Sequence, residues 1–285
     1  MIEKYNTGNI NEVYRLKNEY IDLILRKSKF DNKFETYVLN RLQQYELDIP
    51  LHIASYVVGN EYIMIYKYIE GETLKSISDN EVDQIIKFLL KLHSIEVTKD
   101  EIDLKQPRED LQSMYQYIRK LDGKISRQDY CFICDQYKSL FQERINFESL
   151  SRCFIHSDIK KENLLINREK LYIIDFGNCY IGSRLIDIVR AIMWLFLYSE
   201  DKIDFRKIER FCSEYFRASK LDGLEYKMVP FIVRYCLLYN YVKDKYLFDA
   251  GILSENYVSA TSKRWFEILK NDNVIHRIER IIRNE

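Results

Sequence analysis

The chain has 285 residues, with 44 lysines and arginines against 44 aspartates and glutamates, so its formal net charge is zero. It has no run of five or six like charges, which disfavours a nucleic-acid partner because such partners are bound by basic stripes or tails. A content of 47% hydrophobic and 14% aromatic residues excludes intrinsic disorder. The composition therefore predicts a globular protein with a large buried core.

The longest apolar stretch covers residues 192–198, and it extends back to Ile188 with Arg190 as an interruption. This stretch is far shorter than the ~20 residues that cross a membrane, so it predicts a buried helix and no membrane span. The first residues, Met-Ile-Glu-Lys-Tyr, do not show a basic segment followed by an apolar one. We therefore expect no secretory signal and a cytoplasmic location.

The six cysteines follow no disulfide-framework spacing and stand in hydrophobic surroundings, so they are predicted to be reduced thiols in the core. Cys131 and Cys134 form a C-x-x-C pair with apolar residues between them. A zinc or redox role is disfavoured for this pair, because neither a second such pair nor a histidine pair accompanies it.

The beginning of the chain is predicted to form a small sheet with one helix. Residues 13–16, 20–26 and 62–69 are rich in β-branched, aliphatic and aromatic residues and are bounded by Gly or Asn, which indicates strands. Between them Asp31 can cap a helix that ends before Pro50. Apolar residues recur at helical spacing along it: Phe34, Val38, Leu42 and Tyr45.

Helical patterns dominate after residue 70. Gly71 follows the last predicted strand, and residues 78–81 form a capping-box pattern. Apolar residues on one face of the helix that follows are Val82, Ile85, Ile86, Leu89 and Leu92. Residues 109–150 and 185–285 are also predicted to be helical. Between these two segments lies a β-hairpin signal, with strands at 163–167 and 171–175.

Polar residues able to support phosphoryl transfer stand at both ends of this hairpin. His156-Ser-Asp-Ile-Lys-Lys-Glu-Asn163 precedes it and Ile174-Asp-Phe-Gly177 closes it. The hairpin should return the chain so that Asp158, Asn163 and Asp175 face one cleft. Phosphoryl transfer needs a carboxylate to orient and deprotonate the attacking hydroxyl, and oxygen ligands for Mg²⁺. Asp158 is the predicted base, and Asn163 with Asp175 the predicted metal ligands.

These motifs resemble the aminoglycoside phosphotransferase and choline kinase family, whose pattern is H-x-D-x(4)-N followed by a strand pair and I-D-F/W. The resemblance extends over about residues 5–195, and Ser157 stands where the wider kinase-like fold usually has Gly. It implies an α+β, bilobal, protein-kinase-like fold, with a small sheet lobe carrying one helix and a larger, mainly helical lobe. Residues 1–69 would be the nucleotide-binding lobe and residues 70–285 the catalytic and substrate-binding lobe.

The resemblance also implies the nucleotide contacts. Residues 7–14 look like the loop that covers the nucleotide, and residues 65–71 look like the hinge between lobes. Arg26 stands where the phosphate-binding lysine is usual, although Lys27 and Lys29 are close by. Strand alternation places Arg26 and Lys27 on opposite faces and favours Arg26. The predicted contacts are Gly8, Asn11, Arg26, Glu35, Tyr66, Tyr68 and Lys160.

Other positions are assigned supporting or structural roles. The resemblance makes Asp187 the aspartate that braces the catalytic loop, and His156 is expected to be a structural residue hydrogen-bonded within that loop. Glu35 can equally be a solvated charge on its helix.

Two other functions remain open on the sequence. Lys160 in D-I-K-x-x-N is also typical of serine/threonine protein kinases, but these carry a long activation segment closed by A-P-E. Nine residues separate Gly177 from Asp187 and no proline lies between Pro107 and Pro230, so a small-molecule acceptor fits better. A catalytically silent nucleotide-binding regulator has no chemical need for Asp158, Asn163 and Asp175 together.

The expected reaction is Mg²⁺-dependent transfer of the γ-phosphate of ATP or GTP to a hydroxyl of a small molecule. An aminoglycoside-type antibiotic, an amino alcohol, a sugar and an amino acid all remain possible acceptors. Residues 188–285 carry 14 acidic against 17 basic side chains, which weakly disfavours a polycationic drug. A monomer or weak homodimer is expected.

Overall fold

The computed structural model describes residues 1–5, 11–106, 109–198 and 203–285, and the chain divides into two compact units. Unit 1 comprises Met1–Pro107 and Phe154–Ile181. Unit 2 comprises Arg108–Cys153 and Gly182–Glu285. That residues 1–69 bind the nucleotide and residues 70–285 carry catalysis and substrate binding stays a prediction.

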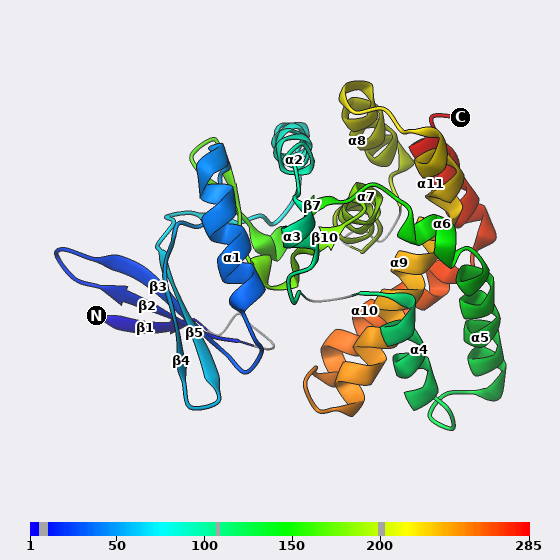
Figure 1. The fold of residues 1–285 in the computed structure, drawn as a ribbon, viewed down its shortest axis with the longest axis horizontal. Helices are drawn as coiled ribbons and strands as arrows, with labels where there is room; N and C mark the ends of the chain where they lie inside the picture. The colour runs from blue at the N-terminus through cyan, green and yellow to red at the C-terminus, as the bar shows by residue number, and fades with distance from the viewer. Residues whose placement is uncertain (6–10, 107–108, 199–202) are drawn as a thin grey trace. The chain divides into compact units, whose positions relative to one another are not determined.

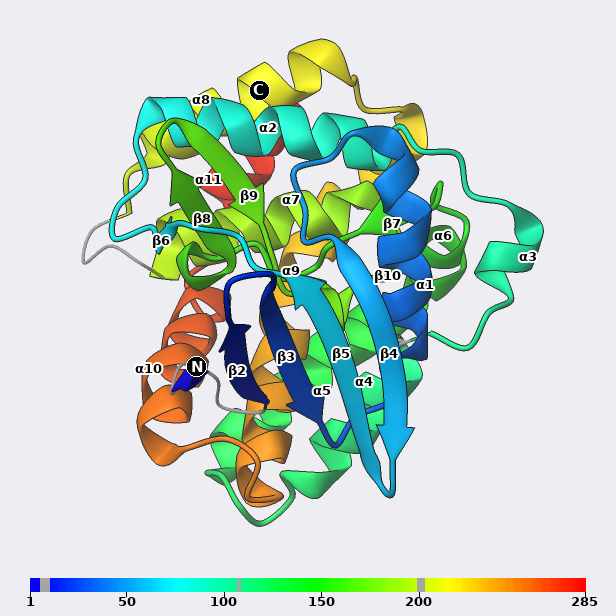
Figure 2. The ribbon, with the colours of Figure 1, turned by 90° about the vertical axis from the view of Figure 1, so that its left-hand side faces the viewer.

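Unit 1 is built on a five-stranded antiparallel sheet with the strand order β1-β2-β3-β5-β4 (Figure 2). Its strands are β1 (Ile2–Tyr5), β2 (Glu12–Lys17), β3 (Asp22–Ser28), β4 (His52–Val58) and β5 (Glu61–Lys67). The two edge strands, β1 and β4, are not predicted by the sequence pattern. Both strands lie half in solvent and lack the alternation of apolar and polar residues that marks a strand with one buried face.

The predicted start of β3 was wrong by two residues. Asn18 Oδ1 accepts hydrogen bonds from the backbone N–H groups of Tyr20 and Ile21, both at 2.8 Å. This Asx-type turn competes with the ladder, so pairing with β2 begins at Asp22.

One helix, α1 (Lys33–Leu42), accompanies the sheet and contacts β4. The N-cap is Asn32, one residue after the predicted Asp31, while Asp31 Oδ1 accepts a hydrogen bond from the N–H of Lys33 at 3.0 Å. The helix passes into a 3₁₀ turn, Gln43–Tyr45, before Pro50. Its buried face is made of Phe34, Val38, Leu39 and Leu42, and Glu35 lies buried beside them.

The rest of unit 1 surrounds the predicted hairpin. Strands β8 (Leu164–Asn167) and β9 (Lys170–Ile173) pair antiparallel, and β6 (Glu72–Thr73) adds a third strand. Helix α2 (Asp79–His93) begins with the predicted capping box at Ser78 and Glu81. The short helix α3 is Lys99–Ile102, and β7 (Cys153–Ile155) pairs with β10 (Tyr180–Gly182).

Unit 2 is helical, as predicted for residues 109–150 and 185–285 (Figure 1). Its helices are α4 (Leu111–Lys120), α5 (Arg127–Gln142), α6 (Arg144–Glu148), α7 (Arg184–Ile192), α8 (Phe205–Ala218), α9 (Gly223–Asp249), α10 (Glu255–Leu269) and α11 (Asp272–Arg283). The buried apolar stretch after α7 continues as a π-helical turn, Met193–Tyr198.

Helix α9 is the centre of unit 2 and contacts α4, α5, α7, α10 and α11. It buries residues around most of its circumference, which is typical of a helix enclosed by others. Pro230 interrupts it and cannot donate the helical hydrogen bond to the carbonyl of Tyr226. Arg283 Nε of α11 donates to that carbonyl instead at 3.0 Å, so the packing of α11 compensates the proline.

The six cysteines are free thiols, and Cys153, Cys179, Cys212 and Cys236 are buried. Burial raises the pKa of Cys236 to about 12, which keeps this thiol protonated and unreactive. The prediction of core thiols was wrong for Cys131, which is exposed on α5.

Gly71, in the predicted hinge, packs closely against the backbone of the hairpin. A Cβ at this position would lie 2.9 Å from the carbonyl oxygen of Ile166 in β8, and backbone cannot move aside cheaply. We expect Gly71→Ala to lower the free energy of unfolding by about 1–3 kcal/mol in urea denaturation. Gly223→Ala is the matched control, because nothing lies within 4 Å of its Cβ position. An equal, small effect of both substitutions would contradict this packing.

Candidate active site

Arg26 on β3 is the best-anchored cation of the predicted site. It pairs with Met64 across the β3–β5 ladder and is 8% exposed. Its Nη2 donates to Glu35 Oε2 on α1, and its Nη1 donates to Asp175 Oδ1 at 2.9 Å. The structure thus brings together three predicted residues that stand up to 149 positions apart in the chain.

Lys27, the rival of Arg26, points to the opposite face of the strand. Its Nζ lies 2.9 Å from Glu61 and 3.5 Å from Glu12 in half-exposed ion pairs. This is the placement that strand alternation predicts, and it separates Lys27 from Asp175.

The ion pair of Arg26 and Glu35 is buried, and its electrostatics follow from that burial. Burial alone would lower the pKa of Arg26, but the carboxylates of Glu35 and Asp175 outweigh it and raise the pKa. Burial raises the pKa of Glu35, and Arg26 opposes this change. Arg26 therefore stays charged. Glu35 is not the solvated helix charge that the sequence left open.

The two predicted hinge tyrosines have different surroundings. Tyr66 is buried, and its hydroxyl donates to Glu35 Oε1 at 3.1 Å. It therefore orients the same carboxylate that accepts from Arg26. Tyr68 lies apart from this group, with its ring centroid 3.6 Å from the Arg15 guanidinium carbon. Gly8 lies outside the described residues. Asn11, just before β2, has a buried Oδ1 with no hydrogen-bond partner among the described atoms.

Asp158, the predicted base, is 7% exposed. Its Oδ2 accepts from Lys160 Nζ at 2.8 Å and from Asn163 Nδ2 at 3.1 Å. Asn163 Nδ2 also donates to the Asp158 carbonyl at 2.8 Å, which fixes the amide. Because its nitrogen is turned toward Asp158, the Asn163 Oδ1 points away and can serve as a ligand.

Asn178 is a member of this group that the sequence analysis missed. Its Nδ2 lies 3.4 Å from Asp158 Oδ2, so it adds a third, weaker donor to the same oxygen. The available signal was its place directly after Asp175-Phe-Gly177. That place alone does not specify the direction in which the turn runs.

His156 has the structural role expected of it. Its Nδ1 accepts from the backbone N–H of Asp158 at 3.2 Å, and its Nε2 lies 3.1 Å from the carbonyl oxygen of Ile174. The ring meets Phe176 edge-on at 4.6 Å between centroids. The fully buried imidazole therefore connects the predicted catalytic loop to the turn at Asp175.

The hairpin brings Asn163 and Asp175 close, as its spacing predicts. The N–H of Ile174 donates to the carbonyl of Asn163 at 2.9 Å. A carboxylate and an amide oxygen are suitable ligands for Mg²⁺. The described residues contain no cluster of three His, Cys, Asp or Glu side chains that could hold a metal unaided. A metal here would complete its coordination with phosphate oxygens and water.

Asp187, the predicted brace of the catalytic loop, is fully buried in α7 of unit 2.

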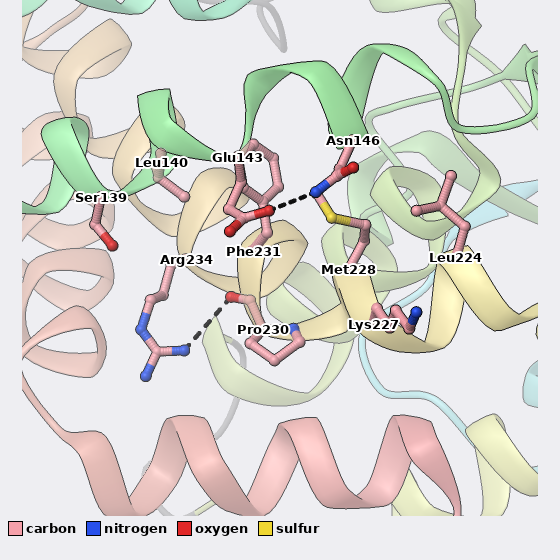
Figure 3. A pocket seen from close by; sticks show the side chains of 10 residues that line it. All are labelled: Ser139, Leu140, Glu143, Asn146, Leu224, Lys227, Met228, Pro230, Phe231 and Arg234. Atoms are coloured by element: carbon pink, nitrogen blue, oxygen red, sulfur yellow. Dashed lines mark hydrogen bonds between the residues drawn. The ribbon is translucent and has the colours of Figure 1, made fainter.

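A cavity of about 560 Å³ lies in unit 2 (Figure 3). Leu140 and Glu143 line it beside Met228, Phe231 and Arg234 of α9. None of the predicted catalytic or metal-binding residues lines this cavity, so it is not the candidate active site. Over the described parts of the chain, no helix has the length and apolarity that a membrane crossing requires.

A family model described as the phosphotransferase enzyme family matches residues 2–219. Among curated proteins, none matches the chain. Among solved structures, the chain is similar to a choline kinase from Cryptosporidium parvum Iowa II, with 15% identity and a TM-score of 0.69. This match covers 98% of this chain and 91% of that chain.

Two further structures contain nucleotides. One is a spectinomycin phosphotransferase in complex with ADP and spectinomycin, at 16% identity and a TM-score of 0.64, covering 99% of this chain and 93% of that chain. The other is an amicoumacin kinase in complex with AMP-PNP and Ca²⁺, at 14% identity and a TM-score of 0.71, covering 96% and 89%. These similarities confirm the predicted α+β, protein-kinase-like fold.

Removing one partner of the buried pair of Arg26 and Glu35 should destabilise the protein strongly, because it leaves the other charge without its main counter-ion. Glu35→Gln keeps the side-chain shape but removes the carboxylate that neutralises a buried guanidinium. Breaking a buried pair from one side typically costs about 3–5 kcal/mol, and we expect a loss of this size in urea denaturation. Glu61→Gln is the control, because its pair with Lys27 is half-exposed and should contribute about 0–1 kcal/mol. Equal losses in both variants would show that burial of the pair does not matter.

Proposed function

Because the chain belongs to the phosphotransferase enzyme family, we propose that it transfers the γ-phosphate of Mg²⁺-bound ATP to a hydroxyl of a small molecule. The family assignment confirms the resemblance and the phosphotransferase activity predicted from the sequence. The donor, the metal and the acceptor are our proposals. The observation that supports them most is the convergence of Asp158, Asn163 and Asp175 at the two ends of one hairpin.

Asp158 is proposed to orient the acceptor hydroxyl and to take its proton. Three donors converge on its Oδ2, from Lys160, Asn163 and Asn178, and they fix the orientation of the carboxylate. A fixed carboxylate can hold a hydroxyl in line with the phosphate, and such positioning supplies most of the catalysis in phosphoryl transfer. Lys160 Nζ lies 2.8 Å from Asp158 Oδ2 and is proposed to contact the transferred phosphate.

Asn163 and Asp175 are proposed to hold Mg²⁺. Their chemistry fits: the Asn163 amide is fixed with its oxygen turned away from Asp158, and the Asp175 side chain is 38% exposed and accessible to a hydrated ion. Bound Mg²⁺ would neutralise charge on the phosphates. On the other side of the nucleotide, Gly8, Asn11, Arg26, Tyr66 and Tyr68 are the proposed contacts, with Glu35 holding Arg26.

ATP is proposed as the donor because two similar structures contain ADP and AMP-PNP. GTP remains the alternative predicted from the sequence. The cytoplasmic location and the monomeric or weakly dimeric state also stay predictions.

A small acceptor is favoured over a protein. After Asp175 the chain makes one 3₁₀ turn, Phe176–Asn178, then β10, and α7 begins at Arg184. This leaves no room for an activation segment that would shape a groove for a peptide. The similar proteins are named as a choline kinase, a spectinomycin phosphotransferase and an amicoumacin kinase, so their named substrates are small molecules of different kinds. We propose an acceptor of this general class, such as an amino alcohol, sugar, amino acid or antibiotic.

The proposal is tested by nucleotide turnover with a panel of hydroxyl compounds. Asp158→Asn should lower kcat by about 10²–10⁴-fold, because the amide cannot accept the hydroxyl proton, while nucleotide affinity stays unchanged. The control is Glu162→Gln, an exposed acid in the same loop. If wild type phosphorylates a protein and no small molecule, the protein-kinase alternative is correct. If it binds nucleotide and phosphorylates nothing, the silent regulator is correct.

The metal assignment has its own test. Asp175→Ala removes the carboxylate, so Mg²⁺ should no longer strengthen nucleotide binding in calorimetry. Asp48→Ala is the control, because this half-exposed carboxylate of unit 1 pairs with Lys170. An unchanged effect of Mg²⁺ in Asp175→Ala would exclude Asp175 as the ligand.

A further inference from the structure

The Arg26 side chain contacts two carboxylates with different arms. Nη2 donates to Glu35, and Nη1 donates to Asp175 Oδ1 at 2.9 Å. Its Nε is buried and has no hydrogen-bond partner among the described atoms. The Arg26 guanidinium thus contacts both Glu35, which fixes it, and Asp175, which is proposed to hold the metal.

The two carboxylates differ in how firmly they are held. Glu35 is 5% exposed and also accepts from Tyr66, so the Nη2 contact is enclosed by protein. The Asp175 side chain is 38% exposed, so water and ions can compete for it. Of the two contacts, the one to Asp175 is therefore the one that can be exchanged.

Gly177 allows this close arrangement. A Cβ at this position would lie 3.3 Å from Asp175 Oδ1 and 3.6 Å from Arg26 Nη1. The absence of a side chain leaves space directly beside the Arg26–Asp175 contact. A ligand oxygen can approach the pair from there.

We propose that the Nη1 arm of Arg26 takes the place of the metal ion on Asp175 in the empty protein, and so couples metal binding to phosphate binding. This inference rests on the proposed function. A metal ion on Asp175 displaces the Nη1 arm. The displaced arm then turns to a phosphate oxygen, and Nη2 stays on Glu35.

Metal binding and nucleotide binding are coupled because both require the Arg26–Asp175 contact to break. A metal binding alone must break the Arg26–Asp175 contact, and so must a nucleotide that engages Nη1 alone. When both bind, the contact is broken once. Each ligand therefore strengthens the binding of the other, and this effect adds to the direct attraction between metal and phosphate.

Arginine suits this role because its planar group offers separate donors in a fixed geometry. A lysine at position 26 would instead carry its charge on a single ammonium group. It can pair with Glu35 or with Asp175, but it is not shaped to bridge both. Arg26→Lys should therefore retain a cation near Glu35 while weakening the coupling.

The experiment measures metal and nucleotide binding separately in wild type, Arg26→Gln, Arg26→Lys and the control Lys27→Gln. Mn²⁺ binding to the nucleotide-free protein is followed by electron paramagnetic resonance. ADP affinity is measured by calorimetry with and without Mg²⁺. In Arg26→Gln we expect Mn²⁺ alone to bind more tightly, within the 5–150-fold typical of couplings between sites. The enhancement of ADP affinity by Mg²⁺ should fall by a similar factor.

Arg26→Lys should also raise the Mn²⁺ affinity and lower the enhancement of ADP affinity by Mg²⁺. This variant replaces Arg26→Gln in the test if Arg26→Gln does not fold. Lys27→Gln should match wild type, because Lys27 lies on the opposite face of β3 and pairs with Glu12 and Glu61. Mn²⁺ affinity that is equal in wild type and both Arg26 variants overturns the proposal, as does ADP affinity lost equally with and without Mg²⁺. If wild type binds no ADP, the proposed function fails, and the Mn²⁺ measurement still decides whether Arg26 shields Asp175.

Discussion

The ion pair between Arg26 and Glu35 is the interaction on which the candidate site depends. Removing a guanidinium and a carboxylate from water is costly, and the cost is offset only where both keep well-placed partners. Here β3 supplies the cation, α1 supplies the anion, and Tyr66 of β5 donates to that anion. The pair therefore fixes the helix against the sheet and leaves one arm of Arg26 to reach Asp175.

The conformation of the predicted catalytic loop depends mainly on hydrogen bonds that involve the backbone. The hydrogen bond from Ile174 N–H to the Asn163 carbonyl closes the hairpin and sets the distance between the base and the proposed metal ligands. His156 then joins the two ends a second time, by accepting from Asp158 N–H and contacting the Ile174 carbonyl. Asn163 and Asp175, which are 12 residues apart, are thus held at the two ends of one closed hairpin.

Much of this arrangement can be predicted from the sequence, because it follows from periodicity and from the hairpin. Period-two alternation separates Arg26 from Lys27, and the structure has them on opposite faces. The edge strands β1 and β4 were missed, because they lie half in solvent and carry no alternation of apolar and polar residues. Asn178 was missed for another reason: its contact with Asp158 depends on the direction of a turn, which no local pattern specifies.

Of the five non-glycine residues with positive φ in the described parts of the chain, two lie in the candidate site. Ser157 has φ 69° and Asp175 has φ 64°, values that favour glycine and cost a residue with a Cβ about 1–3 kcal/mol. The first value explains why glycine is usual at the position of Ser157. Such strain persists where the surroundings determine the conformation, and here His156, Phe176 and the closed hairpin do so. The left-handed turn at Ser157 directs Asp158 toward Asn163, and the one at Asp175 sets its carboxylate against Arg26. The strained residues are therefore part of how the fold positions the carboxylates.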